Sequence, residues 1–347
     1  MKKIVYLLFI LALAIPVVIA AARSDSGLHS GQKPSGKITI YTSMYEDVIS
    51  SMEEILKERF LNCDVDFVYG STSQIQAMIA TEQGTGKLGC DILLVAEPSY
   101  SLELKEKGLL HRYTSAEAGN IAFNYDREGY WYPVRVSNMV LAYNPEKTKK
   151  SSVPDSFYGF AYNAGLRGAV SMSNPLISGT AMTAAAALRD KYSYGYFDAL
   201  GKQKVAVEAS SIAITKLESG EYKEIMVLEE SILKKRQEGS TRLEIIYPKD
   251  GAIVIPSTIM IIAGKWSANN NTRSAEKIAD WFLSPQGQLA IVDGGMHSVR
   301  KDFELVPGGS IPTSWIQIGS MPLNWENVFR QRDEIQARFE EYVIFRR

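Results

Sequence analysis

Three short stretches of small hydroxyl residues are candidate anion sites, because each follows an apolar run and precedes a helical pattern. The stretches are Thr42-Ser43-Met44, Gly70-Ser71-Thr72-Ser73 and Ser178-Gly179-Thr180. The first turn of a helix carries backbone N–H groups without an acceptor, at the positive end of the helix dipole. Phosphate and carboxylate groups bind at such helix starts. The sequence therefore predicts an anion site if the fold brings the three starts together, with Gly70 and Gly179 allowing the backbone to approach a ligand closely.

Each of these hydroxyl residues also has a purely structural explanation. Ser and Thr are preferred N-caps with or without a ligand. Ser43 with Glu46, and Ser71 with Gln74, have the spacing of capping boxes. A single hydroxyl residue is better explained as a cap, and only the three starts together favour anion binding.

Arg135 is the cation best placed to join such a site, because it interrupts a run of apolar and small residues. Two roles remain open for its guanidinium: a salt bridge across a hinge, or a bidentate contact with a phosphate. Catalysis is disfavoured, since the sequence has no GxSxG motif and His111 and His297 have no nucleophile or metal-ligand context. We expect a protein that is not an enzyme.

The N-terminus predicts export. Lys2 and Lys3 precede an apolar run from Ile4 that ends in small residues at Ala22, which is the order of a secretory signal. We interpret residues 1–22 as the signal peptide and residues 23–36, rich in Ser and Gly, as a flexible tether. An uncleaved anchor is the alternative, because the run approaches the roughly 20 residues that span a bilayer. Either way we expect a periplasmic protein.

Composition narrows the partners. The 347 residues suffice for two ordinary domains, and a net charge of −1 argues against a nucleic-acid partner. Two cysteines and three histidines show no metal-ligand spacing, so we expect no metal cofactor. Whether Cys63 and Cys90 form a disulfide stays open.

The hydrophobic pattern predicts strands that alternate with helices in two blocks. The predicted strands are 37–41, 65–69 and 91–95, then 169–172, 205–207 and 225–228. Such alternation implies parallel sheets covered on both faces. Two long extended segments, 130–143 and 243–263, predict strands that cross between the blocks at a hinge. The charges of the last predicted helix, 324–345, are expected to form a solvated outer face.

Several segments together resemble the extracellular solute-binding proteins of ABC importers, in the cluster of ferric-ion-, phosphonate- and hexose-phosphate-binding members. The segments are YTSMYEDVISSMEEILKERF, YGSTSQIQAMIATE, CDILLVAE, YWYPVRVSNMVLAYNPE, SNPLISGTAMTAAAAL, LESGEY, IIYPKDGAIVIPSTIMIIAG, WFLSPQGQLAIVDGG and HSVR. No segment is specific alone. Their order and spacing carry the likeness, from Lys37 to about Lys301.

The resemblance implies an α/β fold of two doubly wound lobes joined by two crossing strands, with the ligand in the cleft between them. Lobe 1 would comprise residues 37–134 and 256–305, and lobe 2 residues 135–255 and 306–347. It also implies that the three helix starts converge on that cleft.

The resemblance adds three site residues. Tyr45 stands near a position that often holds an iron ligand, whereas Glu229 and Glu230 stand where ferric members carry two adjacent tyrosines. At least one of these glutamates is expected to be exposed. A carboxylate facing the cleft would repel a bare anion and favour a ligand that also carries hydroxyl or ammonium groups.

We therefore expect a monomeric binding protein that delivers a small phosphorylated or phosphonate-type organic anion to an inner-membrane ABC permease. Two alternatives remain: a ferric-ion-binding protein of an iron importer, and a binding protein that feeds a signalling receptor.

Overall fold

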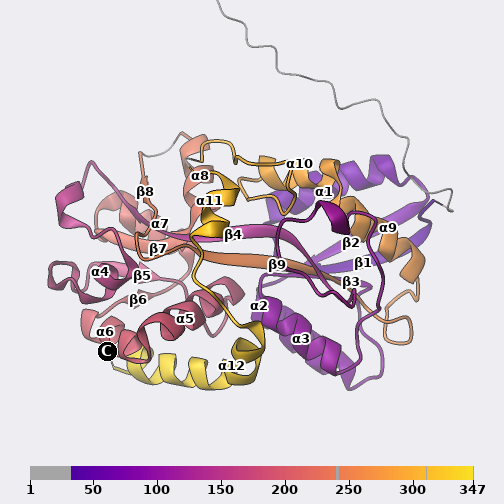
Figure 1. Ribbon diagram of the computed structural model, residues 1–347, viewed down its shortest axis with the longest axis horizontal. Helices are drawn as coiled ribbons and strands as arrows, with labels where there is room; N and C mark the ends of the chain where they lie inside the picture. The colour runs from indigo at the N-terminus through magenta and orange to yellow at the C-terminus, as the bar shows by residue number, and fades with distance from the viewer. Residues whose placement is uncertain (1–32, 240–241, 310, 347) are drawn as a thin grey trace, which may run out of the picture. The chain divides into compact units, whose positions relative to one another are not determined.

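The computed structural model describes residues 33–239, 242–309 and 311–346 (Figure 1). The predicted signal segment, residues 1–22, and the predicted tether as far as residue 32 lie outside the described residues. The last residue of the predicted tether, Gly36, already belongs to the first strand. Among the described residues, no helix combines the length and the apolar character needed to cross a membrane.

The first block folds into the three predicted strand–helix units. They are β1 (Gly36–Thr42), α1 (Glu46–Arg59), β2 (Cys63–Tyr69), α2 (Thr72–Gln83), β3 (Ile92–Val95) and α3 (Pro98–Glu106). Strand β1 pairs in parallel with β2 on one side and β3 on the other. Because parallel strands end at the same edge of a sheet, the starts of α1, α2 and α3 lie along one edge.

The second block repeats this arrangement. Its elements are α4 (Phe157–Tyr162), β5 (Val170–Met172), α5 (Gly179–Tyr192), α6 (Gly195–Gln203), β6 (Ala206–Val207), α7 (Ser210–Ser219), β7 (Glu224–Leu228) and α8 (Glu229–Gln237). Strand β5 pairs in parallel with both β6 and β7. The starts of α5, α7 and α8 therefore share a second edge.

Two long strands join the blocks. They are β4 (Tyr132–Tyr143) and β9 (Ile253–Ile261), which pair antiparallel with each other. Within the described residues the strands form one nine-stranded sheet, in the order β2-β1-β3-β9-β4-β7-β5-β6, with β8 (Glu244–Ile246) paired to β4. The predicted fold class, two doubly wound lobes joined by two crossing strands, is confirmed.

The remaining helices complete the two covering layers. They are α9 (Thr272–Leu283), α10 (Pro285–Asp293), α11 (Thr313–Ile318) and α12 (Trp325–Phe339), the last continuing into a wider turn at Glu340–Ile344. Figure 1 shows α1, α8, α10 and α11 on one face of the sheet, and α2, α3, α5 and α12 on the other.

Separate hydrophobic cores define the two lobes. One cluster contains Ile38 and Phe282, and we name the elements around it lobe 1. Another contains Leu200, Phe339 and the alanines of α5, and we name the elements around it lobe 2. The small side chains of α5 let this helix pack closely on its neighbours.

Each crossing strand packs in the core of one lobe along part of its length and in the core of the other lobe along the rest. On β4, Val136 packs in the core of lobe 1 and Met139 in that of lobe 2. On β9, Ile255 packs in lobe 2 and Ile259 in lobe 1. The boundaries at residues 134/135 and 255/256 themselves remain predictions.

One of the two predicted capping boxes is present. The Ser71 side chain accepts from the N–H of Gln74, and the Gln74 side chain accepts from the N–H of Ser71, so that box is confirmed. The box of Ser43 with Glu46 was wrong, because Tyr45 is the N-cap of α1 and makes no side-chain cap. The N–H of Ser43 instead extends the sheet by donating to the Leu94 carbonyl at 3.0 Å, so the helix begins later than expected.

The cysteines are both free and buried. Cys63 begins β2 and Cys90 precedes β3, while β1 lies between these strands. The sheet order therefore separates the two thiols.

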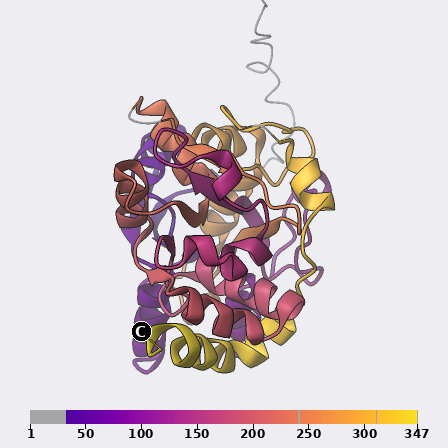
Figure 2. The same ribbon diagram turned by 90° about the vertical axis from the view of Figure 1, so that its left-hand side faces the viewer.

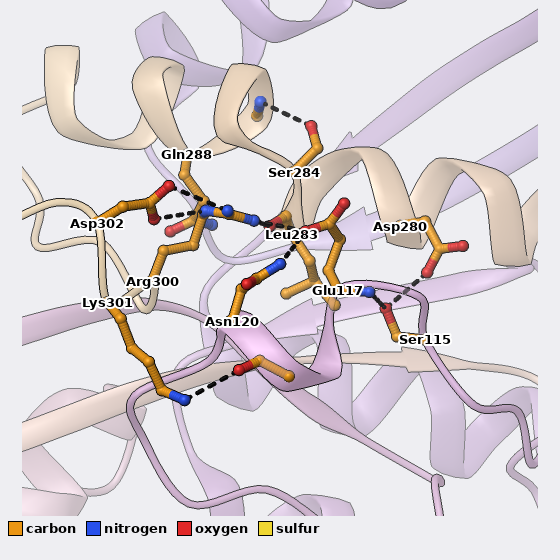
Figure 3. Close-up of polar contacts among 12 residues, drawn as sticks. Ser115, Glu117, Asn120, Asp280, Leu283, Ser284, Gln288, Arg300, Lys301 and Asp302 are labelled. Carbon is orange, nitrogen blue, oxygen red and sulfur yellow. Dashed lines mark hydrogen bonds and ion pairs between the residues drawn. The ribbon is translucent and has the colours of Figure 1, made fainter. Parts of the chain in front are cut away.

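Polar contacts hold the segment that follows α10 beside the loop at residues 115–120 (Figure 3). The Arg300 guanidinium donates to Glu117 at 2.5 Å and to Asp302 at 2.8 and 3.0 Å. Gln288 donates to the Val134 carbonyl at 2.7 Å and accepts from the N–H of Val299 at 2.9 Å. These bonds hold residues 297–302 in place beside the crossing strand.

Candidate functional site

The starts of α2 and α5 meet across the two lobes. The N–H of Ser73 in α2 donates to the carbonyl of Ile177, just before α5, at 3.4 Å. Each start carries a hydroxyl pair: the side-chain oxygens of Ser71 and Ser73 are 3.2 Å apart, and those of Ser178 and Thr180 are 2.9 Å apart. Two of the three predicted helix starts are thus in direct contact.

Ala96, at the end of β3, connects these starts to Ser43. Its N–H donates to the Ser43 hydroxyl at 3.3 Å. A Cβ atom added at Gly179 would lie 2.5 Å from the Ala96 carbonyl oxygen and 2.8 Å from the Thr72 hydroxyl. Gly179 is therefore needed for the two lobes to approach this closely. The structure brings Ser43, Thr72 and Gly179 together around Ala96.

The start of α5 keeps donors for a ligand. Ser178 is the N-cap and accepts from the N–H of Ala181 at 3.2 Å. No acceptor is found among the described residues for the N–H groups of Gly179 and Thr180. The N–H of Gly70 is less available, because it donates to the Thr42 carbonyl at 3.1 Å. The arrangement can therefore receive an anion at the positive end of the α5 dipole.

A second polar group lies where α1 meets α8. The Glu230 carboxylate is buried, 3% exposed, and accepts from the Ser137 hydroxyl at 2.6 Å and the Tyr45 hydroxyl at 3.4 Å. Burial raises the pKa of Glu230 against the opposing effect of the nearby Arg135 charge. The Tyr45 contact crosses between the lobes.

Arg135 contacts neutral groups at the hinge. Its Nε donates to Ser257 on β9 at 2.9 Å, its Nη1 lies 2.6 Å from Met296 Sδ, and its guanidinium sits 5.6 Å from the Tyr45 ring centre. Arg135 forms no ion pair within 4 Å among the described residues. The structure therefore does not bear out the hinge salt bridge, and a contact with phosphate stays a prediction.

Glu229 belongs to a buried network at the hinge. Its Oε2 lies 3.1 Å from His297 Nε2 and accepts from Asn138 at 3.0 Å, while Oε1 accepts from the Tyr247 hydroxyl at 2.6 Å. Thr313 Oγ1 lies 2.9 Å from the other nitrogen of His297. Burial alone would raise the pKa of Glu229, but His297 and these donors lower it. Glu229 is 1% and Glu230 3% exposed, so the expectation that one of them is exposed was wrong.

Sequence reasoning missed four members of this region. Ala96 gave no signal, because its backbone makes the contacts. His297 was set aside for want of ligand context, although it pairs with Glu229. Ser137 and Asn138 did carry a signal, since they are the polar pair inside an otherwise apolar strand.

A cavity of about 250 Å³ lies on the Tyr45 side of the lobe junction. It is lined by Asp47, Lys234, Gln237, Glu238, Asp293, Gly294 and Gly295. Lys234 of α8 donates to Asp47 of α1 at 2.7 Å across this cavity, and Gly295 lies against the Glu230 backbone. None of the predicted hydroxyl residues lines it. In the part of the chain described, no group of three or more His, Cys, Asp and Glu side chains is arranged to hold a metal ion.

Solved structures of the same architecture include binding proteins for different solutes. Iron-bound HitA of Pseudomonas aeruginosa matches with a TM-score of 0.76 at 18% identity, over 88% of this chain and 99% of that chain. AfuA of Actinobacillus pleuropneumoniae, with fructose-6-phosphate bound, matches with a TM-score of 0.77 at 17% identity, over 89% and 99%. A periplasmic thiamin binding protein matches with a TM-score of 0.73 at 16% identity, over 90% and 99%. At these identities the likeness shows the fold, that of a two-lobed periplasmic binding protein.

The family is shown by sequence. The pattern of the bacterial extracellular solute-binding proteins matches residues 90–308, which is more than half of the chain, so the chain belongs to this family. The comparison with curated protein sequences gave no match. The predicted resemblance is confirmed, and the chain is a solute-binding protein.

Gly179→Ala should keep the lobes apart, because its methyl group would collide with the Ala96 carbonyl oxygen at 2.5 Å. Hydrogen exchange at the Ser73 amide, which bonds across the lobes, should then quicken about tenfold. Gly119→Ala is the control, since a Cβ there meets nothing within 4 Å. Unchanged exchange at Ser73 in Gly179→Ala would contradict the close approach of the lobes.

His297→Leu should destabilise the protein by about 3–5 kcal/mol at pH 7, because it leaves the buried Glu229 charge without its imidazole partner. The pKa of Glu229 is lowered in the folded protein, so its contribution is present above the unfolded pKa and fades as the solution is acidified. The difference in the free energy of unfolding between His297→Leu and wild type should therefore become smaller below about pH 4.

The control is His111→Leu, which removes a partly exposed pair with Glu276 and should cost about 1 kcal/mol or less. Urea unfolding of wild type, His297→Leu and His111→Leu, at pH 7 and below about pH 4, measures the differences in the free energy of unfolding. Equal losses for the two variants would refute a special role for the buried pair.

Proposed function

We propose that the protein captures a small phosphorylated or phosphonate-type organic anion between its lobes and delivers it to the permease of an ABC importer. The observation that carries this proposal is the meeting of the α2 and α5 starts from opposite lobes. An anion at this point would receive N–H groups from α5 and hydroxyl groups from both lobes. Family membership supports the binding role and an extracytoplasmic location.

The ligand carries hydroxyl or ammonium groups as well as the anion. Glu230, Ser137 and Tyr45 form a polar group where α1 meets α8. Tyr45 stands two residues after Ser43, whose hydroxyl accepts from the N–H of Ala96 beside the α2–α5 junction. The Glu230 carboxyl group is an acceptor to which hydroxyl or ammonium groups of a ligand would donate, and inorganic phosphate carries no ammonium group. An organic phosphate satisfies both groups at once.

Binding works by closure of the lobes. A ligand that touches both helix starts binds the closed form more tightly than the open form, and this difference shifts the population toward closure. Strands β4 and β9 supply the hinge. The transport role requires no bond to be made or broken, and we propose a monomer without cofactor or enzymatic activity.

The ferric-ion alternative rests on Tyr45, and the structure gives an argument against it. Burial and the neighbouring Glu230 raise the pKa of Tyr45, which disfavours the phenolate that ferric iron prefers as a ligand. Glu229 is already held by His297, Tyr247 and Asn138. A protein that feeds a signalling receptor would have the same site and differ only in its partner.

A thermal-shift panel tests the proposal. The panel contains hexose phosphates, phosphoglycerate, aminoethylphosphonate, sulfate and ferric citrate. A ligand at a hundred times its Kd adds about 2.7 kcal/mol of stability, which raises the melting midpoint by a few degrees. We expect organic phosphates or phosphonates to raise it, and a rise with ferric citrate alone would contradict the proposal.

Ser178→Ala locates the binding site. It should weaken binding of the best organic phosphate about tenfold or more, since a hydrogen bond to a charged group is lost. Ser156→Ala is the matched control, because Ser156 caps α4 with the same geometry, accepting from Gly159 at 3.0 Å. Equal affinity of Ser178→Ala and Ser156→Ala for the ligand would show that the start of α5 is not part of the binding site.

A further inference from the structure

Arg332 of α12 makes three contacts with α3 of the opposite lobe. Its Nε donates to Glu97 at 2.9 Å, its Nη1 to Glu103 at 2.7 Å and its Nη2 to the Ser99 hydroxyl at 3.2 Å. All three nitrogen atoms of the planar guanidinium thus donate to α3 or its N-cap residue. The side chain was expected on a solvated face, and the structure corrects this: it is 14% exposed.

Helix α12 itself belongs to lobe 2. Val328, Ile335 and Phe339 pack in the core of that lobe, and Figure 2 shows α12, in yellow, along the lower edge of the lobe 2 helices. Glu97 is the N-cap residue of α3, which follows β3 in lobe 1. The Arg332 contacts therefore cross between the lobes, on the α2–α5 face of the sheet.

These contacts reach the wall of the candidate site. Glu97 follows Ala96, the residue that touches both Ser43 and Gly179. One turn further along α12, Gln336 donates to the Pro175 carbonyl in the segment before α5, at 3.1 Å. Helix α12 thereby contacts the strand end of lobe 1 and the helix start of lobe 2 that together form the site.

The burial of the charges makes the link strong. The side chains of Glu97 and Glu103 are 3% and 19% exposed, so solvent screens their attraction to Arg332 only weakly. Glu97 also accepts from Gln76 of α2 at 3.1 Å. Separation of the lobes would leave Glu97 buried beside α3 without its cation, which is costly.

We propose that Arg332 is a positioning residue and that α12 is a strap that holds lobe 1 against lobe 2. This inference deepens the proposed function, since it names the residue that favours the closed form. The strap acts on the lobes whether or not a solute is present.

Small-angle scattering of the full protein without added solute tests the strap. Arg332→Met should show a radius of gyration larger than that of wild type, whose compact chain predicts about 20 Å. Arg330→Met is the matched control, since Arg330 is exposed two residues earlier on the same helix, and it should scatter like wild type.

Glu103→Lys is the second variant, which places a cation beside Arg332 and should enlarge the protein in the same way. If Arg332→Met fails to fold, the radius of gyration of Glu103→Lys tests the strap instead. A radius equal to wild type in the folded variants would overturn the strap. If the variants have larger radii of gyration but no phosphate or phosphonate in the thermal-shift panel raises the melting midpoint, the strap is upheld and only the proposed solute is rejected.

Discussion

The close approach of α5 to the end of β3 is the contact on which the site depends. Gly179 has no side chain, and this allows the α5 backbone to reach the Ala96 carbonyl and the Thr72 hydroxyl. Any larger residue would separate the two helix starts and leave each as an ordinary capped helix. The proposed anion site therefore requires the arrangement in which both lobes are in contact.

Two polar groups of different character lie where the lobes meet. The α2–α5 junction offers donors, because hydroxyl and N–H groups gather at helix starts. The group around Glu230 offers acceptors, and burial together with the neighbouring Glu229 charge works against its ionisation. A solute that satisfies both groups needs an anionic end and a donor-bearing end.

Much of the fold followed from local patterns, because each strand–helix unit carries its own hydrophobic period. The Ser71 cap and the two crossing strands were also predictable, since their signals lie within a few residues. The predicted capping box at Ser43 was wrong because the N–H of Ser43 donates to the Leu94 carbonyl and α1 begins later in the chain. That bond joins segments that are far apart in the sequence, so no local pattern signals it. The partners of Glu229 and Arg332 were not predictable, as His297 and Glu97 reach them only through tertiary packing.

A crystal structure of the protein with its best organic phosphate ligand tests the central claim most directly. We expect phosphate oxygens at about 3 Å from the N–H groups of Gly179 and Thr180, with hydroxyl groups of α2 on the other side. Hydroxyl or ammonium groups of the ligand should face Glu230. A phosphate bound away from the α2–α5 junction would show that the helix starts do not form the binding site.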